Sequence, residues 1–344
     1  MFSSPHIHGG DSIRKQMLTV ILALMPATFM SVYLFGWLAC LVLTCCILSS
    51  VLSEYICLKL MDRRKRSLLD GSAALTGLFV GLVLPVLVPW WMAILGSALA
   101  IVLGKQLYGG LGYNPFNPAL TARIILLISF PVYMTSWAIP MPLEQAAINF
   151  YDFSACWQVF FTGVSASAFD AVSMATPLGH VKTALTQQQT VSEALASYQY
   201  QPWQAFIGLE AGSLGETSVL AILLGAALLL GRNLISWHIP TAYILTVALL
   251  ATVFNLIEPD RYAPALFHVL AGGLVLCAFF MATDPVTSPV TPIGQLVFGI
   301  GCGVITWCIR TYANYPEGAM FAVVVMNCAV PLIDHYCRPR VYGR

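Results

Sequence analysis

The sequence predicts an all-α integral membrane protein with about ten transmembrane helices, and its composition is the first reason. Of its 344 residues, 58% are hydrophobic and only 9% are charged, and the mean hydropathy is +0.80. A soluble domain carries about 25% charged residues, because its surface faces water. Charge this sparse indicates that most of the chain lies in lipid. The first sixteen residues are polar and the apolar run after them is too long for a signal-peptide core, so we expect that run to remain as the first membrane helix.

The second reason is the recurrence of apolar runs of about 20 residues, the length that crosses the hydrocarbon layer. Two polar breaks interrupt these runs, at 137–215 and at 283–292 (TDPVTSPVTP). We predict spanning helices in ten segments: 17–36, 38–60, 69–88, 90–106, 117–136, 216–231, 236–256, 264–282, 293–310 and 318–336.

The third observation is the distribution of Lys and Arg, which accumulate on the cytoplasmic side of membrane proteins. Ten spans place both termini on one side. With the termini inside, only Lys182, Arg261 and Arg310 fall outside, and Arg123 falls within a span. The remaining twelve lie in or near the cytoplasm: Arg14, Lys15, Lys59, Arg63, Arg64, Lys65, Arg66, Lys105, Arg232, Arg338, Arg340 and Arg344. We therefore predict cytoplasmic termini and a periplasmic 137–215 segment.

The spans divide into two groups of five, 1–136 and 216–344, around the long segment 137–215. An odd number of spans in each half makes the halves inverted in the membrane. Two pairs of similar stretches support a repeat. DGSAALTGLFVGLVLP (70–85) resembles HVLAGGLVLCAFFMATDP (268–285), and GYNPFNPA (112–119) resembles ANYPEGAM (313–320). Pro- and Asn-rich breaks at membrane depth line cavities or are buried in protein, so we expect a pocket between the halves.

Several functional classes find no support in the sequence. The ten cysteines form no CxxC pair and the six histidines no HxxxH spacing, so we expect no zinc, haem or iron–sulfur site within this chain alone. Neither a GxGxxG after a strand nor a Walker sequence is present, so the chain is not expected to bind a dinucleotide or ATP. We expect no nucleic-acid binding either.

The segment 137–215 contains the string Asp170-Ala171-Val172-Ser173-Met174-Ala175-Thr176-Pro177-Leu178. On composition alone, such a Ser/Thr/Ala/Pro string is typical of a turn or a helix N-cap. A threonine hydroxyl is a weak nucleophile and needs an enzyme to attach anything to it, and small neighbours leave room for that enzyme.

This D-x-x-S-x-A-T pattern resembles the flavin-acceptor motif of the family that contains the B subunit of sodium-pumping NADH:quinone oxidoreductase and the D subunit of the Rnf (SoxR-reducing) complex. Met174 stands where many members have Gly. Other similar stretches cover nearly the whole chain, and KQLYGGLG together with the C-terminal stretch favours the Rnf branch of the family. They are LGKQLYGGLGYNPFNPAL (103–120), LISFPVYMTSW (127–137), GSLGETSVLAILLGAALLL (212–230), FFMATDPVTSP (279–289) and PLIDHYCRPRVYGR (331–344).

The resemblance implies a urea-transporter-like fold of two inverted five-helix repeats and an FMN joined through its phosphate to Thr176. Asp170, Ser173 and Ala175 would form the surrounding acceptor motif. It implies a second, noncovalent riboflavin, and a role as one component of an ion-translocating oxidoreductase that is not catalytic in isolation. That translocase would move electrons between ferredoxin and NAD or related acceptors in the bacterial inner membrane. The implied partners are the A, B, C and E subunits, the FMN-bearing G subunit, a flavin transferase, and membrane lipid.

Three further residues are candidates for cofactor binding: Asn117, Arg123 and Glu216. An ionisable residue within a span is a functional candidate by default, although Arg123 could equally cap carbonyl groups. Glu216 could cap the sixth span or contact the flavin. Single acids near span ends, namely Glu54, Asp70, Asp284 and Asp334, are more often structural. A solute channel or secondary transporter, and an assembly scaffold with a decayed motif, remain as alternatives that covalent flavin would exclude.

Overall fold

The computed structural model describes residues 12–62, 65–140, 151–163, 173–313, 315 and 317–338. These residues are predominantly α-helical, and their one sheet is a two-residue antiparallel pair in which β1 (Trp137–Ala138) faces β2 (Ser173–Met174). Four of the described helices are long and apolar enough to cross a membrane: α1 (Ile13–Leu60), α12 (His238–Ile257), α15 (Pro292–Tyr312) and α16 (Ala319–Tyr336). The chain is therefore a multi-pass membrane protein.

Helix α1 comprises 48 residues in two arms, which contain the first two predicted spans and meet at a kink. Gly36 adopts φ 56° and ψ −141° inside it, a conformation that only glycine reaches without strain, so the chain reverses there. The N-terminus of α1 is capped by Ser12, whose hydroxyl accepts a hydrogen bond from the Lys15 N–H. The two arms follow the predicted segments 17–36 and 38–60 closely.

The third predicted span, 69–88, is not one helix. A 3₁₀ turn, η1 (Lys65–Asp70), ends at Gly71, which has a positive φ of 81°. Helix α2 (Ser72–Val83) follows, and the extended chain from Leu84 leads to Pro89. The apolar run predicts burial correctly, but glycine and proline divide it. The remaining first-half elements are α3 (Trp90–Ile101), the π-helix η2 (Val102–Gln106), α4 (Pro118–Ser129) and α5 (Pro131–Met134).

The second half contains the same kind of interruption. The predicted span 264–282 breaks at Ala271–Gly273, where Gly272 has φ 71°. Residues on either side remain helical, and α4 likewise stops short of the predicted 136, because Pro131 follows Phe130. The other second-half elements are α11 (Val219–Gly231), α13 (Ala265–Leu270), α14 (Leu274–Leu276) and the π-helix η4 (Cys277–Met281).

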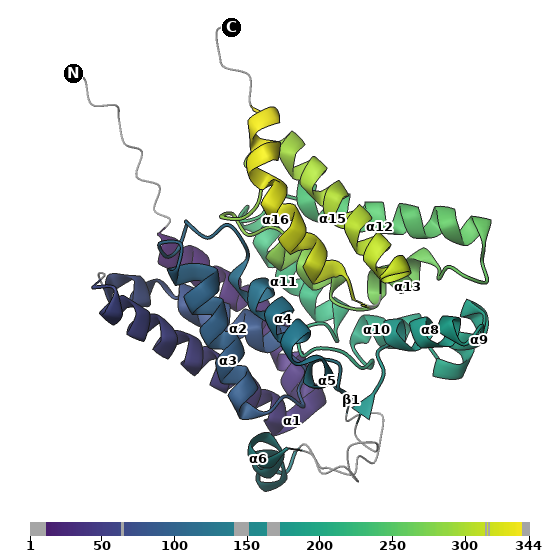
Figure 1. Cartoon of the computed structure of the whole chain (residues 1–344), viewed down its shortest axis with the longest axis horizontal. Helices are drawn as coiled ribbons and strands as arrows, with labels where there is room; N and C mark the ends of the chain where they lie inside the picture. Colours follow the sequence, from purple (N-terminus) through teal and green to yellow (C-terminus); the bar gives the residue numbers. More distant parts are fainter. Residues whose placement is uncertain are drawn as a thin grey trace, which may run out of the picture.

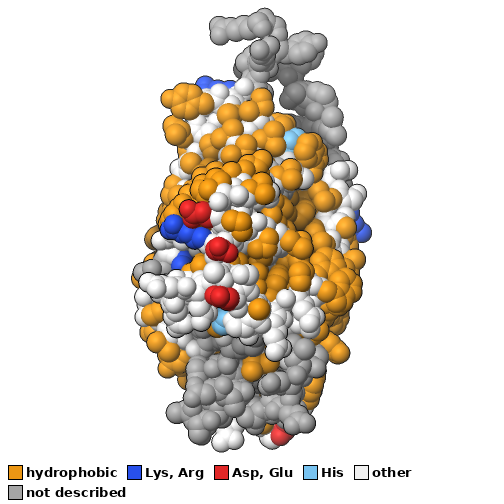
Figure 2. Space-filling view, turned by 90° about the vertical axis from the view of Figure 1, so that its right-hand side faces the viewer, with side chains coloured by type: hydrophobic (Ala, Val, Ile, Leu, Met, Phe, Trp, Pro, Cys, Tyr) orange, Lys and Arg blue, Asp and Glu red, His pale blue; other side chains and the backbone are white. Residues whose placement is uncertain are grey.

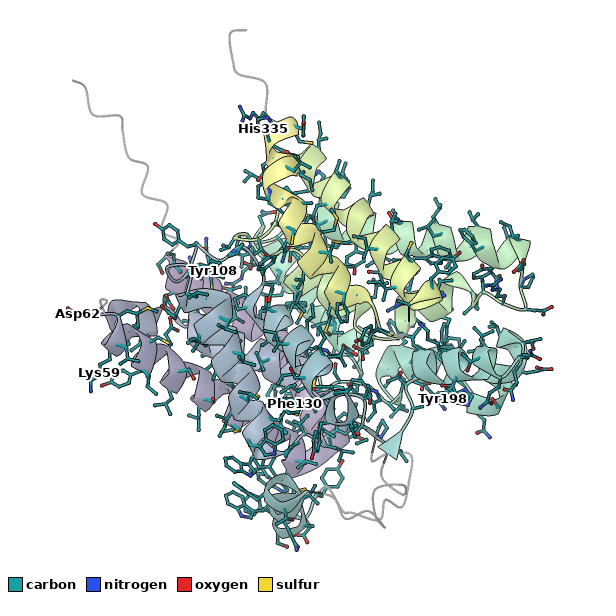
Figure 3. All side chains as sticks on the ribbon, viewed as in Figure 1. Lys59, Asp62, Tyr108, Phe130, Tyr198 and His335 are labelled. Carbon is teal, nitrogen blue, oxygen red and sulfur yellow. The ribbon has the colours of Figure 1, made fainter. Side chains whose placement is uncertain are left out.

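The long segment between the halves folds into short helices rather than a simple linker. They are α6 (Phe153–Thr162), α8 (Pro177–Thr186), α9 (Val191–Tyr198) and α10 (Pro202–Ile207). Helices α8 and α9 pack against α13 in a small separate core that includes Leu178, Ala194 and Phe267. Figure 1 shows α8–α10 extending to the side, with α6 and β1 at the lower end. The end of α16, marked by His335 in Figure 3, lies at the opposite end.

The two halves lie side by side and meet along two helix contacts, α1 with α11 and α4 with α16 (Figure 1). At the first contact, Gly225 of α11 lies so close to α1 that an added Cβ would be 1.9 Å from the Ala23 carbonyl oxygen. Small residues permit such close helix approach. Hydrophobic side chains cover much of the face in Figure 2 and charged side chains on it are few, as expected for a surface that faces lipid.

Corresponding features of the halves recur at one fixed spacing. Gly71 and Gly272, the positive-φ residues at the two helix breaks, are 201 positions apart (272 − 71). Asn117 and Gly318, which precede α4 and α16, have the same separation (318 − 117). So do Gly36, before the second arm of α1, and Trp237, before α12 (237 − 36). The helix order of the two halves therefore matches.

Candidate functional site

Thr176 lies at the N-terminus of α8, where the sequence motif ends. Its side-chain oxygen accepts a hydrogen bond from the Gly179 N–H (3.1 Å), and Pro177 occupies the first helical position. Thr–Pro at this junction is a strong local signal for a helix start, since threonine caps and proline fixes φ. Ala175 beside it is exposed, whereas Thr176 itself is only 6% exposed. The Thr176 side chain is therefore buried, although the residue before it lies at the surface.

A cavity of about 170 Å³ opens beside Thr176; we call it the outer cavity. Residues from α4, β1, α8 and α16 line it, so both halves and the intervening segment contribute. Its walls are mainly apolar and aromatic, with one cation, Arg123, whose guanidinium lies 5.8 Å from the centroid of the Trp137 ring. Its lining residues include Ile124, Leu127, Met134, Trp137, Gly179, Tyr315, Met320 and Phe321.

Arg123 is the centre of a buried ion network. Its Nη2 lies 2.5 Å from Glu317 Oε2, and its Nη1 lies 3.6 Å from Glu216 Oε1. The contact with Glu216 is an ion pair whose distance is too long for a hydrogen bond. Neither Arg123 Nη1 nor Glu216 Oε1 has a hydrogen-bond partner. Because Arg123 lies in α4 of the first half while Glu216 and Glu317 belong to the second half, the network ties the two halves together beside Thr176.

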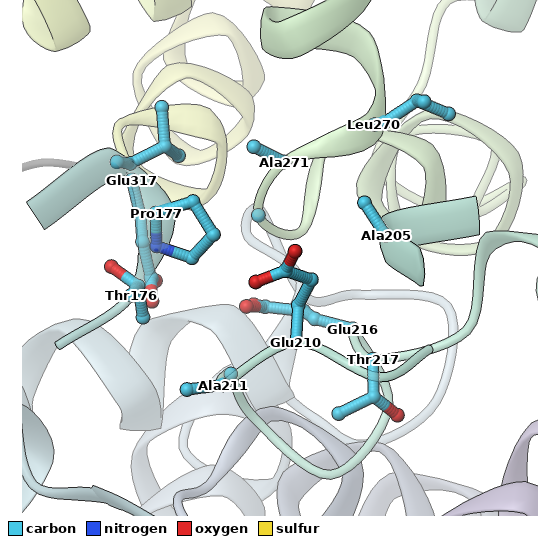
Figure 4. A pocket seen from close by; sticks show the side chains of 13 residues that line it. Thr176, Pro177, Ala205, Glu210, Ala211, Glu216, Thr217, Leu270, Ala271 and Glu317 are labelled. Carbon is cyan, nitrogen blue, oxygen red and sulfur yellow. The ribbon is translucent and has the colours of Figure 1, made fainter. Parts of the chain in front are cut away.

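A second, smaller space of about 20 Å³ lies on the other side of Thr176; we call it the carboxylate cavity. Three acids line it, Glu210, Glu216 and Glu317, together with the helix break at Ala271–Gly272. In Figure 4 the carboxylates of Glu210 and Glu216 point into its centre. Burial raises the pKa of Glu210 to about 7, despite an opposing hydrogen bond from Tyr198.

Arg310 stabilises the helix break in the second half. Its guanidinium donates to the carbonyl oxygens of His268 (2.5 Å), Ala271 (3.0 Å) and Glu317 (2.9 Å). The carbonyls at a helix end have no partner within their own helix, so a buried cation is a fitting substitute. Arg310 is only 6% exposed and lies in the last turn of α15, at the end of the predicted span 293–310.

The first half also has a buried cation beside its helix break. Lys105 Nζ lies 2.7 Å from Glu54 Oε1 and donates to Ser72 Oγ (2.6 Å), immediately after the break at Gly71. Both charged side chains are almost completely buried. Lys105 also borders a cavity of about 240 Å³, the inner cavity, whose lining includes Phe79, Asn114, Asn117, Phe280 and Asp284. This space lies between first-half helices and the second-half segment 280–286.

The sequence matches the family described as NQR2, RnfD, RnfE over residues 1–343. The chain belongs to this family. It is 48% identical over 337 residues to the D subunit of the ion-translocating oxidoreductase complex of Stutzerimonas stutzeri, covering 97% of this chain and 93% of that protein. The corresponding proteins of Halorhodospira halophila and Escherichia coli O6:K15:H31 are 45% and 42% identical, over 100% and 99% of this chain and 95% and 97% of theirs. The resemblance identified from the sequence is confirmed.

For this family member, the structure brings together three of the predicted site residues. Thr176, Arg123 and Glu216 border adjoining cavities. Asn117 lies apart from them, at the inner cavity, where its side chain caps α4 and donates to the Met281 carbonyl (3.4 Å). Asp170 falls outside the described residues, and of Ser173 only the backbone, in β2, is described.

Sequence reasoning missed Glu317, Glu210 and the role of Arg310. For Arg310 the available signal was its place at the end of an apolar run, whereas Glu210 and Glu317 lie in polar loops and gave no such signal. The acids predicted as structural do have local partners. Asp70 accepts from the Ser72 N–H and hydroxyl, Asp284 from Val286 and Thr287, and Asp334 from the Val290 N–H. Across the described part of the chain, no cysteine is joined in a disulfide and no His, Cys, Asp and Glu side chains cluster as metal ligands.

Proposed function

We propose that this chain is the flavin-carrying membrane component of an ion-translocating oxidoreductase complex, with FMN joined covalently to Thr176. The complex would move electrons between ferredoxin and NAD or related acceptors and couple that transfer to the movement of sodium ions or protons. One observation carries the proposal: the motif threonine lies at a helix N-terminus directly beside a cavity that combines apolar and aromatic walls with a single buried cation.

The residues present fit a flavin phosphoester. A phosphate on Thr176 would lie at the N-terminus of α8, where free N–H groups and the helix dipole favour negative charge. Gly179 leaves space there, since an added Cβ would be 3.2 Å from Thr176 Oγ1. When bound, the flavin would supply the one- and two-electron redox chemistry that side chains lack.

The chain's own residues would position and tune such a group. Trp137 and Phe321 offer flat faces in the outer cavity, and burial there excludes water. Arg123 supplies a fixed positive charge near Thr176, and its 2.5 Å pair with Glu317 holds the guanidinium in place. A cation in a site of low polarity favours any ligand that gains negative charge on reduction.

We place the second, noncovalent flavin, a riboflavin, in the inner cavity. Asn114, Asn117, Lys105 and Asp284 provide hydrogen-bonding groups there, and Phe79 and Phe280 provide aromatic surface. The two cavities share α4, with Asn117 bordering one and Arg123 the other. Six residues of α-helix span about 9 Å, a far shorter step than a hydrocarbon layer of about 30 Å.

The constant 201-residue spacing supports two inverted five-helix repeats, with the urea-transporter-like arrangement that the family resemblance implies. In this arrangement the break at Gly71 lies toward the cytoplasm and that at Gly272 toward the periplasm. The termini would be cytoplasmic and Thr176 periplasmic, in the bacterial inner membrane. Partners would be the A, B, C, E and G subunits of the complex and the flavin transferase.

A role as a solute channel or secondary transporter gains no support from the comparisons. The relatives compared are each named as a component of an ion-translocating oxidoreductase complex. A pure transporter also has no use for an acceptor threonine.

The test is the intact mass and in-gel flavin fluorescence of the denatured chain, produced in a host that contains the flavin transferase. We expect one FMN phosphoester on the wild-type chain and none on Thr176→Ala. Thr186→Ala, on the same helix with an exposed side chain outside the lining of the outer cavity, is the matched control and should stay fluorescent. A dark wild-type chain, or a fluorescent Thr176→Ala, would refute the covalent attachment.

A further inference from the structure

The carboxylate cavity has an unbalanced charge. Three acids line it, Glu210, Glu216 and Glu317, and two buried cations lie against it, Arg123 and Arg310. With all five ionised, the group carries one excess negative charge. Burying an uncompensated charge costs several kcal/mol. One positive charge is therefore required for balance.

An unpartnered atom shows where that charge belongs. Glu216 Oε1 has no hydrogen-bond partner, although the Glu216 side chain is only 2% exposed and points into the cavity (Figure 4). The hydrogen bond of Arg123 goes to Glu317 instead. Buried carboxylate oxygens in native proteins are almost always satisfied. Glu216 Oε1 therefore lacks a hydrogen-bond donor, since Arg123 Nη1 lies 3.6 Å away, too far to donate.

A proton meets the requirement better than a metal ion does. The cavity holds about 20 Å³, room for a single water molecule. A bound alkali or alkaline-earth cation needs about six oxygen ligands at close range. The described residues contain no cluster of three or more acidic or other ligand side chains with metal-binding geometry. A proton needs only one carboxyl oxygen and one acceptor.

We propose that the carboxylate cavity is a proton-binding site, which holds one proton on the carboxyl group of Glu210 or Glu216 and exchanges it with water through Tyr198. The site is a property of the protein chain itself and does not depend on a flavin at Thr176. Release breaks one carboxyl O–H bond, transfers H⁺ to water and leaves a carboxylate, and no electron moves in this step.

The surroundings define an exchange route on one side only. The half-buried Tyr198 contacts Glu210, and its hydroxyl lies 3.3 Å from the Ala175 carbonyl oxygen at the surface. Tyr200 also faces Glu210, and its buried hydroxyl has no other partner. Figure 3 shows Tyr198 on the lateral extension formed by α8–α10. Water therefore reaches Glu210 before Glu216.

The other sides of the cavity offer no competing acceptor. Arg123 and Glu317 close it toward the outer cavity, and Arg310 closes it toward α15. His268 contacts Arg310 directly, so a second positive charge on that ring is unfavourable. Cys277 is a buried thiol, and Lys182 is occupied by the carbonyls of Arg310, Ala313 and Tyr315. The exchangeable proton thus belongs to Glu210 and Glu216.

Infrared spectroscopy of the purified full chain, produced without the flavin transferase, tests the proposal. The C=O stretch of a protonated carboxylic acid is separate from the bands of carboxylates. We expect this band in the wild-type chain below pH 7 and its loss on raising the pH, with a midpoint near the Glu210 pKa of about 7. Other buried acids such as Glu54 contribute equally to wild type and variants, so wild-type-minus-variant spectra isolate the site.

Charge balance makes a sharper prediction for variants. Glu210→Gln and Glu216→Gln each remove one negative charge, so each alone should abolish the whole band rather than half of it. Glu258→Gln, at a side chain that is 53% exposed, is the matched control and should leave the band intact. Tyr198→Phe should keep the band and slow its hydrogen–deuterium exchange several-fold.

Three results would overturn the proposal. One is a wild-type chain whose spectrum does not differ from that of either Gln variant. Another is a band that persists in both Gln variants. The third is a band that disappears when sodium replaces choline at constant pH, because a cation rather than a proton would then occupy the cavity. All three readouts come from flavin-free protein, so they do not depend on whether FMN binds Thr176.

Discussion

The contact between the two halves allows a quantitative test at Gly225. In Gly225→Ala the new Cβ would lie 1.9 Å from the backbone oxygen of Ala23 and 3.0 Å from the Phe280 ring. Ordinary contact begins at 3.4 Å, so α1 and α11 must separate by about 1.5 Å. No side-chain rotation relieves the first clash, because the atom is backbone.

Overpacking of this kind costs about 1–3 kcal/mol, and a backbone clash belongs at the upper end. Replacing glycine by alanine in a helix returns about 1 kcal/mol through helix propensity. We expect a net loss of about 2 kcal/mol in the free energy of unfolding. Because Phe280 lines the inner cavity, riboflavin retention should fall as well.

The assay is reversible denaturant unfolding in detergent, with Gly231→Ala as matched control. Gly231 lies on the same helix, and an added Cβ there meets nothing within 4 Å. This control should be as stable as the wild-type chain or slightly more stable. Equal stability of the two variants would refute the close contact between α1 and α11.

Three other perturbations have definite expected outcomes. Arg310→Met leaves three buried carbonyl groups without a donor and should cost at least about 3 kcal/mol in denaturant unfolding, whereas Arg310→Lys should cost less. Lys105→Met leaves the buried Glu54 without its cation and should lower the free energy of unfolding by about 3–5 kcal/mol. Adding Glu54→Gln to this variant should restore most of that loss. For Glu210, burial raises the pKa from 4.5 to about 7, so the folded state binds its proton more tightly. The stability of wild type relative to Glu210→Gln should therefore fall as pH rises from 4.5 to 7 and stay constant above, as thermal unfolding against pH would show.

Each of these outcomes can fail in a recognisable way. A fully stable Arg310→Met would mean that the helix break needs no donor. A double variant no more stable than Lys105→Met would mean that the pair with Glu54 is not the source of the cost. If the stability of Glu210→Gln depended on pH in the same way as that of wild type, a group other than Glu210 would be responsible for the titration.

The positions of the helices could be predicted from the sequence, because apolar runs of sufficient length have few alternatives in lipid. Helices occur in all ten predicted segments. The interruptions at Gly71 and Gly272 were harder to predict, since both residues fall inside predicted spans. A break at membrane depth is stable only where other groups satisfy its polar atoms. Arg310, which donates to the Ala271 carbonyl, and Lys105, which donates to the Ser72 hydroxyl, are both distant in sequence from the breaks.

The candidate site was only partly predictable for the same reason. Thr176 could be identified because its motif is local, and Arg123 because a charge within a span is conspicuous. Glu317 and Glu210 lie in polar loops, where acids are common and uninformative. Only the fold brings them to Arg123 and Thr176, by joining a loop before α16 to a loop before α11.

The proposed role is tested most directly by electron transfer and ion uptake in membrane vesicles that contain the complete complex. Reduced ferredoxin and NAD are supplied, and NADH formation and ion uptake are measured together. We predict that Thr176→Ala assembles normally but loses both activities, and that Thr186→Ala retains both. Wild-type rates of electron transfer and ion uptake in an assembled Thr176→Ala complex would contradict a flavin on Thr176 as the electron carrier.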